Sequence, residues 1–471
     1  MAIASASRSP ALPLLPKTEN RTVMKAPEWI RLDNASIIYP SCKTRKYATL
    51  YRMAVALDEP VNSTLLDAAL QTTARRFPGL CYTLDKGVFW WFLRRLENAP
   101  VSGPVPAHRP FNFRRNGGYM FKVGAGGNRI TLDMFHVLTD GTGGMTFLLT
   151  LTAEYLKLRY GSDIPAGKWI LDTAQEPQAA ELEDSFDAFS GLRGSLDREQ
   201  RAYHVRGTVL GRSGLNDIKM SFPSAAVRAR AEAFGVTVTE FLAAVMIHSL
   251  QQVREADLRP RKRASLKLEI PVNLRPIFGS ATLRNFSSYV HVGTDVANGP
   301  MTFPEILAEV KQQKRLFVNA RRLTTRIAAN VALEDNLAIR CLPIFIKRPA
   351  INIINRLKGE NYCSQVLSNL GNIVLPEAMA AHVRDVDFML GRTRQRSGSV
   401  ACLSYGGRLN LHFSRRIAER DFEDAFLRQM ASLGLEAAVE HLKPSCAPGE
   451  AEKNRPMRWA KVGLFQPYFA I

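Results

Sequence analysis

The stretch NRITLDMFHVLTDGTGGMTFLLTLTAEYLKLRYG, residues 128–161, decides the fold because it joins a strand pattern to a helix pattern. Apolar side chains alternate in its first part, which places Ile130, Met134 and His136 on one face of a predicted strand. Apolar residues then recur at helical spacing over residues 145–160. The segment HVLTDGTGG between the two patterns is therefore expected to be a loop at the end of a strand.

This loop brings several chemically useful groups together. An imidazole with a reference pKa near 6.5 suits a general base at neutral pH, so His136 is a candidate base. The glycines at 141, 143 and 144 are expected to leave space over the imidazole and to offer backbone amides to an oxyanion. Asp140 follows across a tight turn and is expected to hold that turn. A purely structural histidine at a strand end is the alternative interpretation.

Other catalytic chemistries lack a pattern in this sequence. No serine lies in G-x-S-x-G and no cysteine in C-G-x-C, so a covalent acyl-enzyme has no candidate nucleophile. The 8 histidines form neither H-E-x-x-H nor H-x-H, and we expect no metal site. The 6 cysteines include no C-x-x-C pair, which is typical of a reduced, intracellular protein.

The composition narrows the class of partner. The chain has 471 residues, 46% of them hydrophobic, and a net charge of +20, which favours an anionic partner such as acidic lipid, nucleic acid, an acidic carrier protein or coenzyme A. The sequence contains no zinc finger, RNA-recognition motif or basic zipper, so nucleic acid is not expected. It also lacks a secretory signal and a run of 18 apolar residues, and a cytoplasmic location is expected.

The patterning predicts two α/β halves between two loosely packed tails, residues 1–26 and 443–471. The first half covers residues 27–190 and carries the histidine loop, and the second covers residues 191–442. Further predicted helices span residues 63–76, 223–234, 237–253, 303–330 and 421–433. Further predicted strands span residues 88–93, 265–272, 286–292, 366–376 and 399–414, the last being a hairpin that turns at Gly406-Gly407.

An H-x-x-x-D-G motif between a strand and a helix, in a chain of this length, resembles the coenzyme A-dependent acyltransferase superfamily. That superfamily includes chloramphenicol acetyltransferases, condensation domains of peptide synthetases and alcohol acetyltransferases. Further segments resemble the superfamily in the same order and extend the likeness from about residue 31 to 442: RLDNASIIYP, EIPVNLRPIF with TLRNFSSY, LPIFIKRPAINIINRLKGENYCSQVLSNLGNIVLP, and LSYGGRLNLHFS.

The resemblance implies two chloramphenicol-acetyltransferase-like mixed-sheet halves that form a V-shaped pseudo-dimer around a central tunnel. His136 would be the general base, reached by the acyl donor from one face and by the acceptor from the other. Asp140 would pair with Arg275 and hold the loop, and Gly141 would leave room for the donor. The residues expected to line the substrate tunnel are Asn285, Ser368, Asn369 and Gly371.

The expected reaction moves an acyl group from acyl-coenzyme A, or from an acyl carrier protein, to the hydroxyl of a small-molecule acceptor. No permanently bound cofactor is expected, the chain is expected to be a monomer, and a peripheral membrane contact is compatible with its charge. Phe135 stands where condensation domains usually have the first of two histidines, which disfavours amide formation. A condensation-type N-acyltransferase and a catalytically silent binding protein on the same fold are the alternatives.

Overall fold

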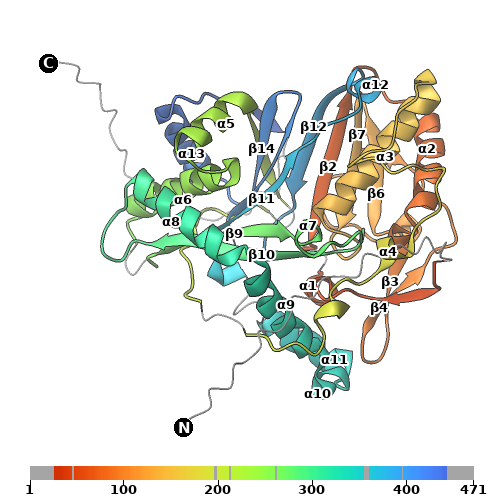
Figure 1. The fold of residues 1–471 in the computed structure, drawn as a ribbon, viewed down its shortest axis with the longest axis horizontal. Coiled ribbons are helices and arrows are strands. Elements are labelled where there is room, and N and C mark those ends of the chain that lie inside the picture. Colours follow the sequence, from red (N-terminus) through yellow and green to blue (C-terminus); the bar gives the residue numbers. More distant parts are fainter. Residues whose placement is uncertain are drawn as a thin grey trace, which may run out of the picture.

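The computed structural model describes residues 26–442 apart from 45–46, 196–198, 212–213, 260–262, 355–359 and 395. The tails predicted at residues 1–26 and 443–471 thus lie outside the described residues, except for Ala26. The chain forms two lobes, each built on a mixed sheet with helices packed against it (Figure 1).

The sheet of the first lobe has 5 strands in the order β12-β2-β7-β6-β5. β2 pairs antiparallel with β7, and Leu50 lies opposite Phe135, so the strand that leads to His136 is central in this sheet. The apolar face of this sheet packs against α2 and α3. α2 begins at Ser63, as predicted, and α3 begins at Gly141. The elements are β2 Leu50–Leu57, β5 Gly103–Pro104, β6 Phe121–Gly126, β7 Arg129–Phe135, β12 Val383–Leu390, α2 Ser63–Arg76 and α3 Gly141–Tyr160.

The sheet of the second lobe has 7 strands in the order β10-β9-β11-β13-β14-β8-β15. The predicted hairpin is confirmed as β13 and β14, and Gly406 and Gly407 supply the positive φ values of 55° and 75° that its turn requires. The strands are β8 Asn216–Pro223, β9 Ser265–Asn273, β10 Ser287–Asp295, β11 Gln365–Asn372, β13 Gly398–Tyr405, β14 Arg408–Arg415 and β15 Ala438–Leu442. The helices in contact with these strands or with one another are α5 Ser224–Ala233, α6 Val238–Ala256, α8 Phe303–Phe317 and α13 Asp421–Ser432.

The helix predicted over residues 303–330 is two helices. α8 ends at Phe317, and Asn319 then caps α9, Ala320–Asp335, by accepting a hydrogen bond from the Arg322 amide. α10, Leu337–Arg340, and α11, Ile344–Ile354, follow it at the lower edge of the molecule (Figure 1). The remaining short helices are α1 Ile38–Cys42, α4 Ala179–Leu182, α7 Arg275–Phe278 and α12 Glu377–Ala380, with 3-10 turns at Pro78–Leu80, Arg114–Asn116, Asp187–Phe189 and Glu360–Tyr362.

A small third sheet has the order β1-β4-β3, with bounds Trp29–Arg31, Trp91–Arg95 and Tyr82–Lys86. The prediction of a strand at residues 88–93 was wrong in its first three residues. Residues 87–90 form the turn between β3 and β4, and β4 begins at Trp91. Val88 and Phe89 are consequently exposed at the tip of this hairpin. No single helix in the described part of the chain is long and apolar enough to cross a membrane, although the bent pair α5 and α6 meets the length and composition criteria together.

Strand β12 ties the lobes together. It comes late in the chain, within the predicted second half, yet pairs antiparallel with β2 of the first sheet. His412 of β14 lies between the lobes, with Nδ1 2.8 Å from Asp217 Oδ2 and Nε2 3.0 Å from Asp387 Oδ1 of β12. Burial alone would lower the pKa of His412, but the charges and hydrogen bonds of the two carboxylates raise it to about 9.

Candidate active site

His136 lies directly after β7, at the start of the loop that leads into α3. Its backbone amide donates to the Thr49 carbonyl at 3.0 Å, which continues the sheet by one bond. The imidazole lies beside two phenol rings, with centroid distances of 5.0 Å to Tyr39 and 5.3 Å to Tyr51. The side chain of His136 is half-buried, so part of it remains exposed.

Asn285 from the second lobe fixes the hydrogen-bonding state of this imidazole. Its Nδ2 donates to Asp33 Oδ2 at 3.2 Å and to the Val137 carbonyl at 3.3 Å. Both partners are acceptors, so the amide oxygen must face His136, where Oδ1 is 3.0 Å from Nδ1. Nδ1 therefore carries the proton in the neutral ring, and Nε2 is left with a free lone pair.

Asp33 anchors this chain of hydrogen bonds, a role that no motif in the sequence predicts. The one usable signal is a lone acidic residue within the largely apolar segment RLDNASIIYP. Asp33 is buried, and its Oδ1 accepts from the Ser36 amide at 2.9 Å. Burial raises the pKa of Asp33, while the charge of Arg284 at 3.8 Å and the hydrogen bonds from Asn285 and Ser36 oppose that rise.

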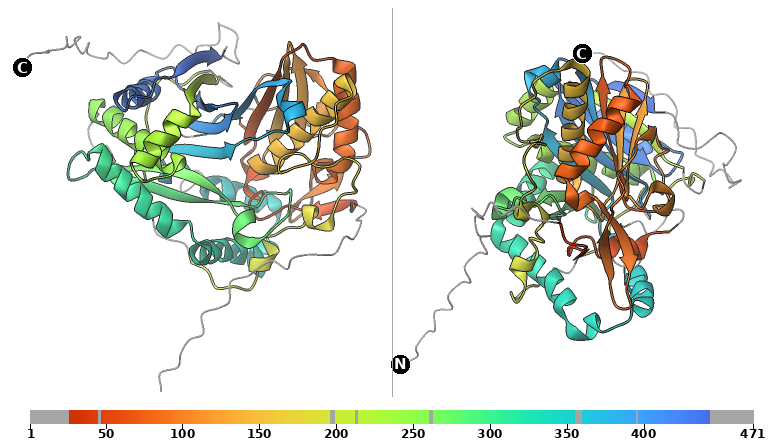
Figure 2. Two further views of the ribbon diagram at one scale, coloured as in Figure 1. Left: turned by 45° about the horizontal axis from the view of Figure 1, so that its top comes forward. Right: turned by 90° about the vertical axis from the view of Figure 1, so that its right-hand side faces the viewer.

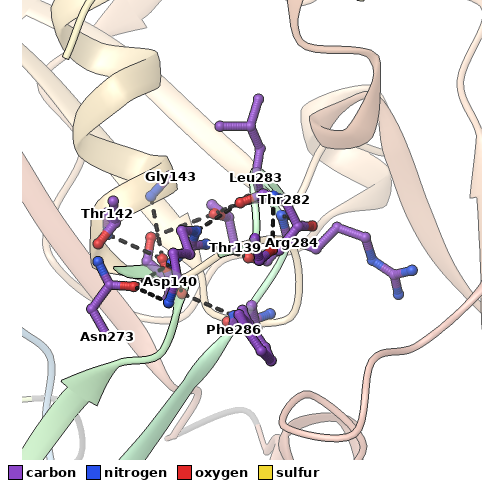
Figure 3. Close-up of polar contacts among 12 residues, drawn as sticks. Thr139, Asp140, Thr142, Gly143, Asn273, Thr282, Leu283, Arg284 and Phe286 are labelled. Carbon is purple, nitrogen blue, oxygen red and sulfur yellow. Dashed lines mark hydrogen bonds and ion pairs between the residues drawn. The ribbon is translucent and has the colours of Figure 1, made fainter. Parts of the chain in front are cut away.

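Asp140 caps α3 and reaches across to the second lobe (Figure 3). Its Oδ1 accepts from the amides of Thr142 and Gly143 at 3.1 and 3.2 Å. Its Oδ2 accepts from Arg275 Nη1 at 2.8 Å and from the Phe286 amide at 3.0 Å. Burial would raise the pKa of Asp140, but Arg275 and these hydrogen bonds outweigh burial and lower it. Because the Asp140 carboxylate accepts four hydrogen bonds in its charged form, it holds the loop in place and does not act as a proton acceptor in catalysis.

Arg275 is the expected partner of Asp140, and it also shapes the loop before Asn285. Its Nε donates to the Thr282 carbonyl and its Nη2 to the Arg284 carbonyl, both at 2.6 Å. One guanidinium therefore joins the cap of the histidine loop to the segment that carries Asn285. The planar fork of donors in arginine matches this set of acceptors, which a lysine ammonium does not reproduce.

The glycines of the loop differ from the expectation. A Cβ on Gly143 would lie 2.1 Å from Thr139 Oγ1, and one on Gly144 would lie 2.5 Å from the Tyr51 hydroxyl. These two glycines thus permit close packing behind the loop and do not open space over the imidazole. Two of the glycine amides expected to be free for an oxyanion are bonded to Asp140, because Gly143 donates to its Oδ1 at 3.2 Å and Gly144 to its carbonyl at 2.9 Å. Gly141 differs from these two glycines, because a Cβ added there would lie 3.0 Å from the end of the flexible Leu370 side chain.

The SNLG segment, residues 368–371, lies within strand β11, in agreement with the strand predicted at residues 366–376. The pairing of β11 with β13 is irregular between Asn369 and Asn372. Asn369 Nδ2 donates to Thr239 Oγ1 at 3.1 Å, and its Oδ1 accepts from the Gly371 amide at 2.7 Å. Leu370 packs toward Gly141 and so brings this segment to the histidine loop. Substrate contacts by Ser368, Asn369 and Gly371 stay a prediction.

A second cluster of titratable groups, Glu269, His291 and Cys363, has the residue types of a metal site. Arg396 occupies it, since its Nη1 lies 2.7 Å from Cys363 Sγ and 3.0 Å from Glu269 Oε2. Burial would lower the pKa of His291, but interactions with Cys363, Glu199 and Glu269 outweigh burial and raise it to about 11. With a guanidinium nitrogen this close to two of the three candidate ligands, the cluster fits an internal ion-pair network better than a metal centre.

No family model matches this chain, and no curated protein matches its sequence. Solved structures do match. The trichothecene 15-O-acetyltransferase of Fusarium sporotrichioides is 11% identical over 90% of this chain and 100% of its own, with a TM-score of 0.56. TRI101 of F. sporotrichioides, complexed with coenzyme A and T-2, is 13% identical over 87% and 99%, with a TM-score of 0.55. The first condensation domain of the calcium-dependent antibiotic synthetase is 16% identical over 90% and 100%, with a TM-score of 0.56.

These structures include acetyltransferases and a condensation domain, and each is matched along nearly its whole length. Low identity with such coverage is evidence of a shared architecture and carries no function by itself. The chain therefore has the two-lobed α/β fold of the coenzyme A-dependent acyltransferases and condensation domains.

Proposed function

We propose that the protein is an acyltransferase that moves an acyl group from a thioester, of coenzyme A or of a carrier protein, to the hydroxyl of an acceptor. The observation that carries this proposal is the chain of hydrogen bonds from His136 through Asn285 to Asp33. Because this chain holds the proton on Nδ1, it leaves Nε2 of His136 unprotonated. A base with this fixed tautomer, set on a loop where the two lobes meet, suits deprotonation of a bound acceptor. The shared fold supports the proposal by analogy.

The proposed reaction needs no covalent intermediate on the protein. His136 Nε2 takes the proton of the acceptor hydroxyl while its oxygen attacks the thioester carbonyl carbon. The tetrahedral intermediate then collapses, the carbon–sulfur bond breaks, and the imidazolium returns the proton to the sulfur. The products are an ester and a free thiol. Asn285 stabilises the imidazolium through Nδ1, and Asp140 with Arg275 holds the loop in place.

A thiol-release assay tests the proposal. Purified protein is mixed with acetyl-coenzyme A or longer acyl-coenzyme A and a panel of alcohols, and the free thiol is measured with a chromogenic disulfide. We expect acceptor-dependent thiol release that falls by about 10²–10⁴-fold in His136→Ala, because a positioned general base supplies a factor of this size. Thiol release by His136→Ala at the wild-type rate would show that His136 is not the base.

A matched control separates loss of the base from loss of a histidine in general. His441 lies on strand β15, is exposed and contacts Arg420, so His441→Ala should keep the wild-type rate. Amine acceptors are run beside the alcohols with the same enzyme. Faster release with amines than with alcohols would favour the condensation-type alternative, and no release with any donor would favour a binding protein.

A further inference from the structure

An exposed apolar surface lies far from the histidine loop in sequence, on the β3–β4 hairpin and on helices α10 and α11. We call it the apolar tip. Its side chains have exposed fractions from 39% at Ile339 to 74% at Leu337. Single exposed apolar residues need no explanation, but a group of large ones on adjoining segments marks an interaction site. The residues of the apolar tip are Val88, Phe89, Leu337, Ile339, Phe345 and Ile346.

The apolar tip is a built surface, because its two segments are locked together. The Ile344 amide donates to the Val88 carbonyl at 2.9 Å. Lys347 is buried between the segments, where its Nζ donates to the carbonyls of Phe89 and Arg340 at 3.1 Å and lies 3.5 Å from the centre of the Trp90 ring. The hairpin and the helices project together at one edge of the molecule (Figure 2). The exposed side chains are therefore presented in a fixed arrangement.

The charges around the apolar tip are mainly positive. Lys86 on the hairpin and Arg348 on α11 are exposed, and Arg340 is half-exposed. Of the nearby carboxylates, Asp85 is paired with Arg94 at 2.6 Å, while Asp335 accepts a hydrogen bond from the Ser190 hydroxyl at 2.6 Å and keeps its charge. Apolar side chains at the centre, cations beside them and a net charge of +20 are complementary to an anionic lipid surface.

We propose that the apolar tip docks onto an anionic phospholipid membrane, with its apolar side chains among the acyl chains and its cations against the lipid phosphates. Two like-charged copies of this chain would repel one another at this edge, so a second copy is a poorer occupant. A projecting tip also suits a deformable lipid phase, into which each exposed side chain can insert separately.

The apolar tip is connected to the candidate site through α1. Asn352 of α11 donates from Nδ2 to the Ser41 carbonyl at 2.7 Å. α1 also carries Tyr39, whose ring lies beside His136. Docking would thus anchor the helix that connects, through α1, to Tyr39 beside His136. An amphiphilic alcohol dissolved in that membrane follows as the acceptor class, and this extension rests on the proposed function.

The docking is tested by sedimentation of the full chain with vesicles of phosphatidylcholine and with vesicles that contain about one quarter phosphatidylglycerol. We expect binding to the anionic vesicles that weakens as salt is raised. The double variant Leu337→Ser/Phe345→Ser should reduce the partition coefficient by about tenfold or more, because two large apolar side chains are lost from the contact. Both positions are exposed, so circular dichroism and thermal unfolding should match the wild type.

The matched control is Leu258→Ser/Val374→Ser, which removes two apolar side chains outside the apolar tip that are at least as exposed as Phe345. It should bind vesicles as the wild type does. Three results would each overturn the docking proposal. These are wild-type protein that stays in the supernatant with anionic vesicles, equal loss of binding in both double variants, and binding that the tip variant retains. Self-association that only the tip variant loses, without vesicle binding, would identify an interface between copies instead.

A second measurement separates the acceptor extension from the docking. Thiol release is followed with a soluble alcohol and with a long-chain alcohol dissolved in the same vesicles. The tip variant should keep the rate with the soluble alcohol and lose rate with the membrane alcohol. Vesicle binding without thiol release in the presence of either alcohol would contradict the proposed function and would leave the docking proposal standing.

Discussion

Asn285→Ala is the sharpest test of how the candidate base is prepared. The substitution removes the acceptor 3.0 Å from His136 Nδ1 and the donor that joins Asp33 to the Val137 carbonyl. Without that acceptor the neutral imidazole can carry its proton on Nε2 instead of on Nδ1. In molecules with this tautomer, Nε2 cannot accept the proton of the acceptor hydroxyl. A hydrogen bond of this kind contributes about 0.5–1.5 kcal/mol, which corresponds to a two- to twelvefold fall in kcat.

The same variant also costs stability, and the two effects can be measured separately. The lost bond from Nδ2 to the Asp33 carboxylate contributes about 1.5–3 kcal/mol and the bond to the carbonyl about 1 kcal/mol. Urea unfolding should therefore show a free energy of unfolding lower by about 2–4 kcal/mol. The kcat values are compared at a temperature where both proteins are fully folded. Asn34→Ala, which removes a single bond to Glu334 at 2.9 Å, is the matched control and should keep its kcat.

Asn285→Asp adds a charge to the same position and gives an independent readout. A carboxylate facing Nδ1 would stabilise the imidazolium, so the acid limb of the pH–rate profile should move to higher pH. The reasoning is refuted if Asn285→Ala keeps the wild-type kcat and Asn285→Asp keeps the wild-type pH profile. Such a pair of results would mean that the tautomer of His136 is set by another group.

Three further predictions concern residues that hold the histidine loop or join the two lobes. Arg275→Ala leaves the buried Asp140 carboxylate without its ion-pair partner and should lower the free energy of unfolding in urea by about 3–5 kcal/mol. Arg275→Lys should restore less than half of that loss. Wild-type stability of Arg275→Ala would contradict the role of Arg275 in holding the loop. Gly143→Ala places a methyl group 2.1 Å from Thr139 Oγ1 and should cost about 1–3 kcal/mol in thermal unfolding. Gly141→Ala should be tolerated, because its methyl group would meet the end of the Leu370 side chain at 3.0 Å and Phe388 at 3.7 Å. The His412 pKa of about 9 lies above the ordinary value of 6.5, so its stabilising effect is complete below pH 6.5 and is lost as the pH rises through 9. The difference in unfolding free energy between wild type and His412→Gln should shrink by up to about 3 kcal/mol over that range, and a constant difference would argue against a charged His412.

The sequence predicted the local elements well because periodicity is a local property. The strand before His136, the helix after it and the hairpin at Gly406-Gly407 all follow from spacing and turn chemistry. The pairing of Asp140 with Arg275 was accessible only through the resemblance, since no pattern in the chain connects residues so far apart. The prediction of free amides was wrong for Gly143 and Gly144, because Gly143 donates to the Asp140 side chain as part of the helix cap and Gly144 donates to the Asp140 carbonyl.

Other features depend on contacts that no local pattern encodes. The orientation of Asn285 follows from Asp33, and these residues are separated by 252 positions. The hairpin turn at Val88 and Phe89 was missed because a run of apolar residues normally predicts a buried strand. Those side chains are exposed where α11 meets the hairpin, so their position depends on tertiary structure and not on propensity.

The late arrival of β12 has a consequence for how the chain is made. One edge of β2 has no partner until residues 383–390 emerge from the ribosome, long after the rest of the first sheet has been synthesised. An unpaired strand edge is a template for aggregation, and domains normally fold as they emerge. The edge of β2 in the nascent first lobe is therefore open to off-pathway strand addition until β12 closes the sheet.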